Sequence, residues 1–318
     1  MTPTTAFGIG AALSAGTLTG SEITLPGAAS TRARESGSGT YLEVRGLTVT
    51  FDGFKAVDGV DLTLIQGDLR FLIGPNGAGK TTLVDAITGL VPATGTVDKS
   101  GQPVLGRKTH RIAKMGIGRT FQTASVFEDL TVEQNLDIAA GARRGLLTLL
   151  RRRRGRETRV TEALETIGLT AMAGTKAGVL PHGQKQWLEI GMLLVQDSDV
   201  MLLDEPVAGM GAEERQATGE LLQRIAAERT VVVVEHDMDF MRAFATTVTV
   251  LAAGKVLAEG TVAEIQADPR VQQVYLGTAA ATGTELADPD LVADQVAAVP
   301  VPGTITTSTN PTTEETPR

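Results

Sequence analysis

The eight residues Gly74–Thr81, Gly-Pro-Asn-Gly-Ala-Gly-Lys-Thr, constrain the fold of this chain more than any other segment. They fit the pattern G-x-x-x-x-G-K-[ST], which by composition alone arises by chance in on the order of one per cent of chains this long. A short apolar run, Leu69–Ile73, precedes them, and a helical pattern follows from Lys80 to Leu90. A strand, a glycine-rich turn and a helix in this order predict an α/β unit that binds phosphate at the helix N-terminus.

Each residue type in this loop has a chemical reason. Gly77 and Gly79 let the backbone wrap closely around an anion and turn its N–H groups inward. Lys80 offers a mobile positive charge to β- and γ-phosphates, and the Thr81 hydroxyl is suited to coordinate Mg²⁺. The sequence therefore predicts a site for ATP and Mg²⁺ rather than a glycine-rich turn with a stray lysine. The expected ATP-binding residues are Gly74, Pro75, Asn76, Gly77, Ala78, Gly79, Lys80, Thr81 and Thr82.

Two carboxylates follow the apolar run Val200–Leu203. Open parallel sheets bind their ligands at the carboxyl ends of the strands, which is where Asp204 and Glu205 would lie. Asp204 is suited to hold Mg²⁺, directly or through water. Glu205 is suited to orient and deprotonate an attacking water. An acidic pair after a strand is by itself most often a solvated turn, so this interpretation depends on the phosphate-binding loop upstream.

A histidine follows the next apolar run, Thr230–Val234, in the sequence Glu235-His236-Asp237. A lone histidine is more often a capping or surface residue than a catalytic one. Because parallel strands end at the same edge of a sheet, we expect His236 to lie near Glu205 and to contact a γ-phosphate. Gln122 directly follows Phe121, and its amide is suited to reach the metal or the water.

Hydrophobic patterning elsewhere indicates a mostly parallel α/β sheet. The expected strands are Tyr41–Thr50, Val57–Ile65, Leu69–Ile73, Val200–Leu203 and Thr230–Val234, and the expected helices are Lys80–Leu90, Gln184–Val195 and Glu213–Glu228. The segments Val248–Leu251 and Lys255–Glu259, on either side of Ala252-Ala253-Gly254, predict a hairpin. Between about residues 123 and 182 strand signals are few, and this stretch is expected to be a helical insertion.

Composition limits the remaining possibilities. Residues 1–40 and 278–318 are rich in small and polar residues and are expected to be disordered tails around a folded part, residues 41–277. The chain has no cysteine, and its net charge of −8 does not favour nucleic acid. No run of about 18 apolar residues and no signal peptide is present, so a membrane role would require partner subunits.

Taken together, the ordered motifs resemble the ATPase subunits of ABC transporters. This resemblance implies a P-loop ABC-ATPase domain with a mostly parallel core sheet, an antiparallel β subdomain and a helical subdomain. Phe51 matches the aromatic that stacks on adenine, and Gln122 matches the Q-loop residue that contributes to the metal site and to catalysis. Leu180, Pro181, His182, Gly183 and Gln184 occupy the place of the signature LSGGQ, which binds the ATP of a partner subunit. Lys80, Asp204, Glu205, Ala208–Gly211 and His236 match the Walker A lysine, Walker B aspartate, catalytic base, D-loop and switch histidine.

Within this family the chain resembles the urea and branched-chain amino acid transporter group. The stretches His182–Met192, Leu202–Met210 and Val232–Met238 are similar to the urea-transporter ATPases, so uptake of urea is expected, with branched-chain amino acids as the alternative. The resemblance implies a heterodimer with a second ATPase, two membrane permease subunits and a solute-binding protein, at the cytoplasmic face of the plasma membrane. No direct contact with nucleic acid is expected.

Two other functions are weighed against transport. The basic cluster Arg151–Arg154 is the one hint of a soluble ABC-type ATPase that acts on ribosomes or DNA, and such a cluster is commonly a solvated helix face. A non-catalytic nucleotide sensor is the other alternative, against which the presence of Glu205 and His236 argues.

Two positions depart from the family pattern. Pro181 stands where a serine hydroxyl usually contacts the partner's ATP, and a lost hydrogen bond to a charged group costs roughly 1.5–3 kcal/mol. The D-loop ends in Gly211, which has no side chain to reach across a dimer. We therefore expect two unequal ATP sites in the dimer, with the weaker one at this chain's signature.

Overall fold

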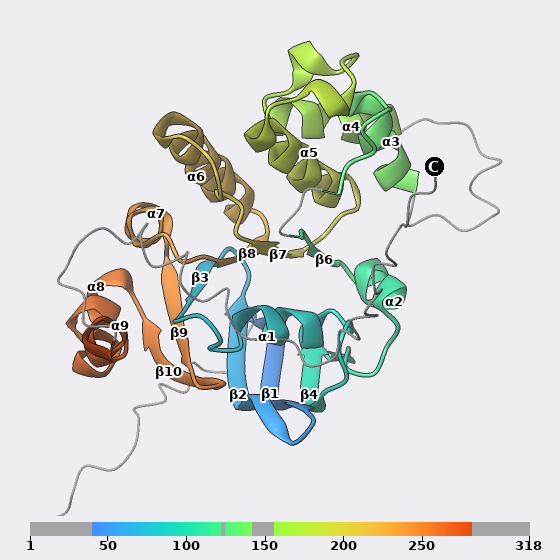
Figure 1. Ribbon diagram of the computed structural model, residues 1–318. Helices are drawn as coiled ribbons and strands as arrows, with labels where there is room; N and C mark the ends of the chain where they lie inside the picture. Colours follow the sequence, from blue (N-terminus) through green and yellow to red (C-terminus); the bar gives the residue numbers. More distant parts are fainter. Residues whose placement is uncertain (1–39, 122–124, 142–155, 282–318) are drawn as a thin grey trace, which may run out of the picture. The chain divides into compact units, whose positions relative to one another are not determined.

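The structure, a computed structural model, describes residues 40–121, 125–141 and 156–281. Gln122, the basic cluster Arg151–Arg154 and most of both expected tails lie outside the described residues. Figure 1 shows the arrangement of the helices and strands.

A six-stranded sheet forms the centre of the fold, in the order β10-β9-β3-β8-β7-β6. Its strands are β3 (Leu69–Ile73), β6 (Ile117–Arg119), β7 (Val200–Asp204), β8 (Thr230–Val234), β9 (Thr247–Ala252) and β10 (Lys255–Gly260). All neighbours pair in parallel except β9 and β10, which form the predicted hairpin. The mostly parallel core is thereby confirmed.

Both faces of this sheet are covered, which explains why its strands are continuous apolar runs. Every residue of β7 and of β8 is buried. Successive side chains alternate between two hydrophobic cores. Leu202 and Val232 pack on the side of helix α1 (Lys80–Ile87), whereas Met201 and Val233 pack on the side of helices α6 (Ala212–Ala226) and α7 (Met238–Phe244).

A second, four-stranded antiparallel sheet has the order β2-β1-β4-β5 and contributes to the core around α1. Its strands are β1 (Thr40–Phe51), β2 (Phe54–Ile65), β4 (Thr94–Lys99) and β5 (Gln102–Pro103). The sequence interpretation ended the first strand at Thr50 and overlooked the turn that follows. Asp52 and Gly53 both have positive φ, as a type I′ turn requires, and they join β1 to β2 in a two-residue hairpin.

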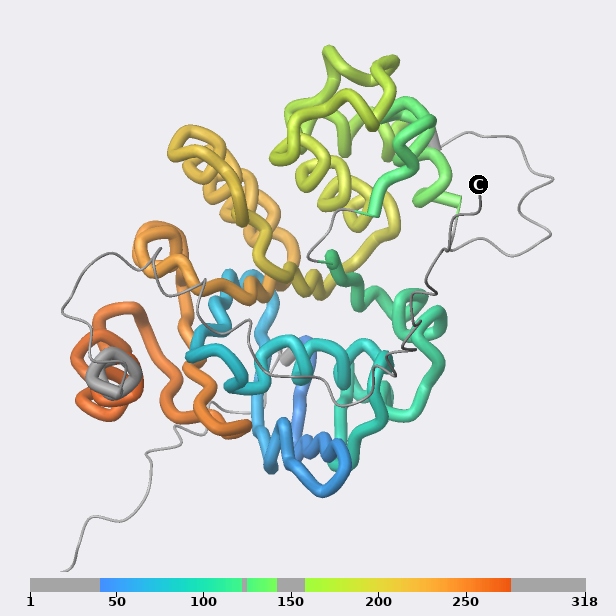
Figure 2. Tube along the Cα trace, in the orientation of Figure 1, coloured from blue at the N-terminus to red at the C-terminus, as the bar shows by residue number. Residues whose placement is uncertain are grey.

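The chain leaves the large sheet after β6 and returns to it at β7, and the helical part lies in between (Figure 2). It contains α3 (Val132–Gly141), α4 (Arg156–Thr166), two 3₁₀ turns (Thr170–Met172 and Ala177–Val179) and α5 (His182–Val195), while α2 (Thr109–Lys114) precedes it. Leu136, Leu164 and Leu188, one from each of the three longer helices, share a core of their own. Helix α5 therefore packs with the helical part, although the expected insertion ended where this helix begins.

The C-terminal helices are α8 (Val262–Ala267) and α9 (Pro269–Ala281). Helix α9 runs four residues past Gly277, where the sequence interpretation ended the folded part. The run Ala279-Ala280-Ala281 explains the extension, since alanine has the highest helix propensity and continues a helix that is already formed. Of the helices in the described ranges, none is both long and apolar enough to cross a membrane.

Candidate nucleotide-binding and catalytic site

The loop between β3 and α1 is held by two close backbone contacts. A Cβ on Gly74 would lie 2.1 Å from the Leu251 carbonyl oxygen, and a Cβ on Gly79 would lie 2.3 Å from the Ala56 carbonyl oxygen. Gly77 also has positive φ, but among the described residues a Cβ there would meet nothing within 4 Å. Close packing against the backbone thus requires glycine at Gly74 and Gly79. The role predicted for Gly77 and Gly79, to let the backbone wrap around an anion, stays a prediction.

Lys80 begins α1 and folds back over the loop. Its ammonium group donates hydrogen bonds to the carbonyl oxygens of Gly74, at 2.7 Å, and Pro75, at 3.2 Å. Burial lowers the pKa of Lys80, and the nearby carboxylates of Glu205 and Asp204 oppose that shift. Thr81 is exposed and Thr82 is half-buried in the same first turn. The loop therefore combines a cation with the N–H groups of a helix N-terminus, which is the arrangement that binds anions.

Asp204, the last residue of β7, is buried among charged groups. Its backbone N–H donates to the Thr120 hydroxyl at 3.1 Å, and its Oδ2 lies 3.2 Å from Arg119 Nη2. Arg119 also pairs with Asp85 of α1. Burial raises the pKa of Asp204, the negative charges of Glu205 and Asp85 raise it further, and Arg119 lowers it.

The second carboxylate oxygen of Asp204 supports a metal site. Oδ1 is buried and has no hydrogen-bond partner within the described ranges. Buried polar oxygens are normally satisfied, so this oxygen calls for a ligand from outside the protein. Oxygen ligands from carboxylates and hydroxyls are those that Mg²⁺ prefers. The donor set at the end of β7 therefore fits a hydrated divalent cation.

Glu205 and His236 lie together, as the sequence predicted. Because β7 and β8 are neighbours, both residues leave the sheet at the same edge, and His236 Nδ1 is 3.8 Å from Glu205 Oε1. The side chains are partly open to solvent, 66% exposed for His236 and 32% for Glu205, so water can reach both. The backbone of Glu205 adopts a φ of 48°, which non-glycine residues rarely adopt, and its N–H donates to the Val234 carbonyl at 2.9 Å.

The signature residues lie around the start of α5. Leu180 is buried, and Pro181 is the N-cap, with a carbonyl that accepts from Lys185 N–H but no side-chain cap. His182 is exposed, Gly183 is buried against Glu214 of α6, and Gln184 has a buried Oε1 without a hydrogen-bond partner in the part of the chain that the structure describes. Of the five, Gly183 lies next to α6, and among the described residues none of them hydrogen-bonds to Lys80, Asp204 or Glu205.

Phe51 lies at the end of β1 and is 44% exposed. It pairs across the hairpin with Phe54, and the strand that begins there contacts Gly79 through Ala56. An exposed aromatic ring thus belongs to the hairpin that touches the phosphate-binding loop. Gln122 falls among the residues that the structure does not describe.

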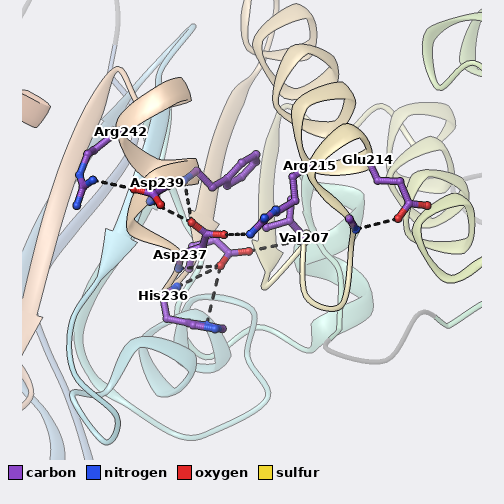
Figure 3. A network of polar contacts seen from close by, with 10 residues as sticks. Val207, Glu214, Arg215, His236, Asp237, Asp239 and Arg242 are labelled. Carbon is purple, nitrogen blue, oxygen red and sulfur yellow. Dashed lines mark hydrogen bonds and ion pairs between the residues drawn. The ribbon is translucent and has the colours of Figure 1, made fainter. Parts of the chain in front are cut away.

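Two residues near the site received no role from the sequence. Arg119 joins Asp204 to α1, and the run Gly116–Thr120 before Phe121 gave no sign of this pairing. Glu235 is buried, and its carboxylate accepts hydrogen bonds from Val207, His236 and Asp237 N–H groups (Figure 3). Burial raises the pKa of Glu235, and these three N–H groups oppose that shift. An acidic residue that follows a buried strand directly and precedes a histidine is a signal that could have identified it.

Comparison with known proteins places this geometry in a family. A family model described as ABC transporter matches residues 57–208, and one described as branched-chain amino acid ATP-binding cassette transporter matches residues 255–281. The high-affinity branched-chain amino acid transport ATP-binding protein BraF of Pseudomonas aeruginosa is 36% identical over 250 residues, which cover 75% of this chain and 98% of BraF. The chain belongs to the ABC transporter ATP-binding proteins.

Further relatives and solved structures support the assignment of this chain to the ABC ATPases. LivG of Escherichia coli, also named as a branched-chain amino acid transport ATP-binding protein, is 36% identical over 75% of the chain and 98% of LivG. A solved ATP-binding cassette of an ABC transporter in its ADP conformation superposes with a TM-score of 0.65 at 28% identity, covering 75% of this chain and 99% of that one. A dimeric cassette bound to ADP and Pi gives a TM-score of 0.61 at 25% identity, covering 70% and 98%.

The P-loop ABC-ATPase fold and the binding of ATP are thereby confirmed, and this ABC ATPase hydrolyses ATP in a reaction coupled to transport. The finer expectation of urea is not supported by these relatives, whose names give branched-chain amino acids, the stated alternative.

Proposed function

We propose that this chain powers an ABC importer by hydrolysing ATP·Mg²⁺ with Glu205 as general base. The observation that carries the proposal is the 3.8 Å approach of Glu205 and His236 at the sheet edge where Asp204 also ends β7. A base, a γ-phosphate contact and a metal carboxylate would then face the loop that holds Lys80. This is the set of groups that phosphoryl transfer to water requires.

Each residue of the site has a proposed role in binding or hydrolysing ATP. Lys80 and the N–H groups of the loop would bind the β- and γ-phosphates and stabilise the charge that develops there. Glu205 would accept the proton of the attacking water, and His236 would donate a hydrogen bond to the γ-phosphate. Thr81 and Asp204, with Gln122, would hold Mg²⁺, which when bound neutralises phosphate charge. Phe51 would stack on the adenine.

The chain carries one set of these motifs, so it supplies half of a dimer. We infer a head-to-tail heterodimer in which Leu180–Gln184 bind the ATP held by a second ATPase subunit. Two membrane permease subunits and a solute-binding protein complete the assembly, with this chain on the cytoplasmic face of the plasma membrane. The transport names of the relatives support this assembly over one with nucleic acid, and the net charge of −8 agrees.

The solute has two candidates. The names of BraF and LivG, together with the family model over residues 255–281, favour a branched-chain amino acid. The resemblance of His182–Met192 and Val232–Met238 to urea-transporter ATPases favours urea. Neither solute touches this subunit in the proposed assembly, so the decision comes from the complete transporter.

The test uses the complex purified from its own membranes and reconstituted with its solute-binding protein. ATPase activity is measured with leucine, with urea and without solute. Stimulation by leucine alone supports the amino acid importer, and stimulation by urea alone supports the urea importer. Stimulation by neither, together with co-purification with nucleic acid, would contradict the transport proposal.

A further inference from the structure

The carboxylate of Glu235 joins two segments that are far apart in the sequence. Its Oε1 accepts a hydrogen bond from Val207 N–H at 3.3 Å. Its Oε2 accepts from His236 N–H at 3.1 Å and from Asp237 N–H at 3.4 Å. The side chain is 1% exposed, so these contacts are shielded from water. Charge-assisted bonds to backbone donors are among the stronger hydrogen bonds in proteins.

The first of these segments contains Glu205. Val207 lies two residues after Glu205, whose left-handed backbone conformation persists only where neighbours hold it. Two contacts do so. Glu205 N–H donates to the Val234 carbonyl at 2.9 Å, and Ala208 N–H donates to the Glu205 carbonyl at 3.2 Å. The bond from Val207 to Glu235 is the third, and it ties the turn to the residue that follows Val234.

The second segment contains His236. The side chain of His236 is largely exposed, but its N–H is fixed by Glu235, and its Nδ1 lies 4.0 Å from Glu235 Oε2. Asp237 is held in addition by Arg215 of α6 at 2.8 Å, and it caps α7. Figure 3 shows the contact between Arg215 and Asp237, with His236 next to Asp237. The backbone that carries His236 is therefore fixed from two directions.

We propose that Glu235 is a positioning residue that fixes Glu205 and His236 relative to each other. This inference rests on the proposed function, which gives both residues their roles in ATP hydrolysis. The three backbone N–H groups are shared between the two oxygens of Glu235, Oε1 and Oε2. A carboxylate can accept at both oxygens, whereas an amide can accept at only one. In Glu235→Gln one oxygen becomes an NH₂ group that faces a backbone N–H, so at least one tie is lost while the size of the side chain is kept.

Kinetics of the complete transporter test the proposal. Glu235→Gln should lower kcat for ATP by about 10- to 100-fold, since small misplacements of catalytic groups have effects of this size. The KM for ATP and the affinity for ADP should stay within about twofold, because the phosphate-binding loop is untouched.

The matched control is Asp68→Asn. Asp68 is also a buried carboxylate, but it lies just before β3 and pairs with Arg70. This control should lower the melting temperature and leave kcat unchanged.

Hydrogen exchange supplies a second readout that does not depend on a variant's folding. In the unaltered protein the amides of Val207, His236 and Asp237 should be protected relative to the exposed Gly209. Glu235→Gln should accelerate exchange at these three amides, and Asp68→Asn should not. Unprotected Val207 in the unaltered protein, or a Glu235→Gln complex with the parental kcat, would overturn the positioning role.

Glu205→Gln in the same assay separates this inference from the function on which it rests. If Glu205→Gln lowers kcat and Glu235→Gln retains the parental kcat, only the positioning role fails. If Glu205→Gln itself retains the parental turnover, the proposed catalytic site fails.

Discussion

Arg119 Nη2 lies 3.2 Å from Asp204 Oδ2, and the same guanidinium pairs with Asp85 and lies over the Phe121 ring, 5.0 Å from its centre. A single buried cation thus links helix α1, the carboxylate proposed to hold Mg²⁺, and the residue directly before Gln122. Removal of this cation leaves Asp204 with uncompensated negative charge.

Arg119→Met should therefore destabilise the nucleotide-free protein by about 3–5 kcal/mol, as breaking a buried ion pair does. Bound Mg²⁺ would supply the missing positive charge, so Mg·ADP should raise the melting temperature more in the variant than in the parent. Thermal unfolding with and without Mg·ADP measures both effects. The exposed pair Arg242–Asp239 provides the control, since Arg242→Met should change stability by less than about 1 kcal/mol. Equal ligand-induced shifts in the parent and Arg119→Met would contradict this role.

Glu189 of α5 predicts a pH dependence. It is 6% exposed, its carboxylate accepts from Phe121 N–H at 3.3 Å, and burial raises its pKa from 4.5 to about 7. Between these values the folded protein binds a proton that the unfolded chain does not. The contribution of Glu189 to the free energy of unfolding therefore falls as pH rises from about 4.5 to about 7. Above about pH 7 this contribution is fully lost.

Glu189→Gln removes the group that titrates, so the free energy of unfolding no longer falls with pH at this position. The variant should be more stable than the parent at pH 8, by up to about 3 kcal/mol, and the difference should shrink toward zero as pH falls to 5. Urea unfolding at both pH values measures the change. Glu165→Gln, at an exposed position of α4, should show no such difference. A Glu189→Gln protein that is less stable than its parent by the same amount at both pH values would refute the assignment.

Pro181→Ser tests the unequal ATP sites. A serine N-cap adds about 1 kcal/mol to helix stability, while loss of proline costs about 0.4–1 kcal/mol through the unfolded chain, so stability should change little. The added hydroxyl should nevertheless raise the ATPase rate of the heterodimer, because it would contact the partner's ATP. Pro181→Ala lacks the hydroxyl and should not raise the rate. No change in ATP affinity or rate with serine, or an equal rise with alanine, counts against the hypothesis.

Gly74→Ala tests the fit of the phosphate-binding loop. Its Cβ would lie 2.1 Å from the Leu251 carbonyl, a backbone atom that cannot move aside cheaply. Gly53 in the β1–β2 turn also has positive φ, but a Cβ there meets nothing within 4 Å in the part of the chain that the structure describes. Alanine is strained at both positions, because both have positive φ, and only Gly74→Ala adds a collision. Urea unfolding should therefore show a clearly larger loss for Gly74→Ala, and equal losses would contradict the close contact.

The sequence predicted the parts of this molecule that local pattern specifies. Continuous apolar runs such as Val200–Leu203 and Thr230–Val234 marked the buried parallel strands. Asp204, one residue after the first run, and His236, two residues after the second, were placed at the same sheet edge. Parallel pairing makes that inference possible, because neighbouring strands end together.

Contacts between distant segments were not predictable in this way. Arg119 and Asp204 are 85 residues apart, and Val207 and Glu235 are 28 apart. Neither pairing leaves a periodic signal, since each depends on which strands become neighbours. The type I′ turn at Asp52-Gly53 was present as a local signal and was overlooked.

The most direct measurement of the central claim is ATP turnover by the complete transporter with Lys80→Ala and with Glu205→Gln. Lys80→Ala should weaken ATP binding, because the loop loses its cation. Glu205→Gln should keep ATP bound and lower kcat by about 10²–10⁴-fold, the range that a general base contributes. Turnover at the parental rate by both variants, assembled with their partners, would show that neither the loop nor the carboxylate performs the chemistry assigned to it.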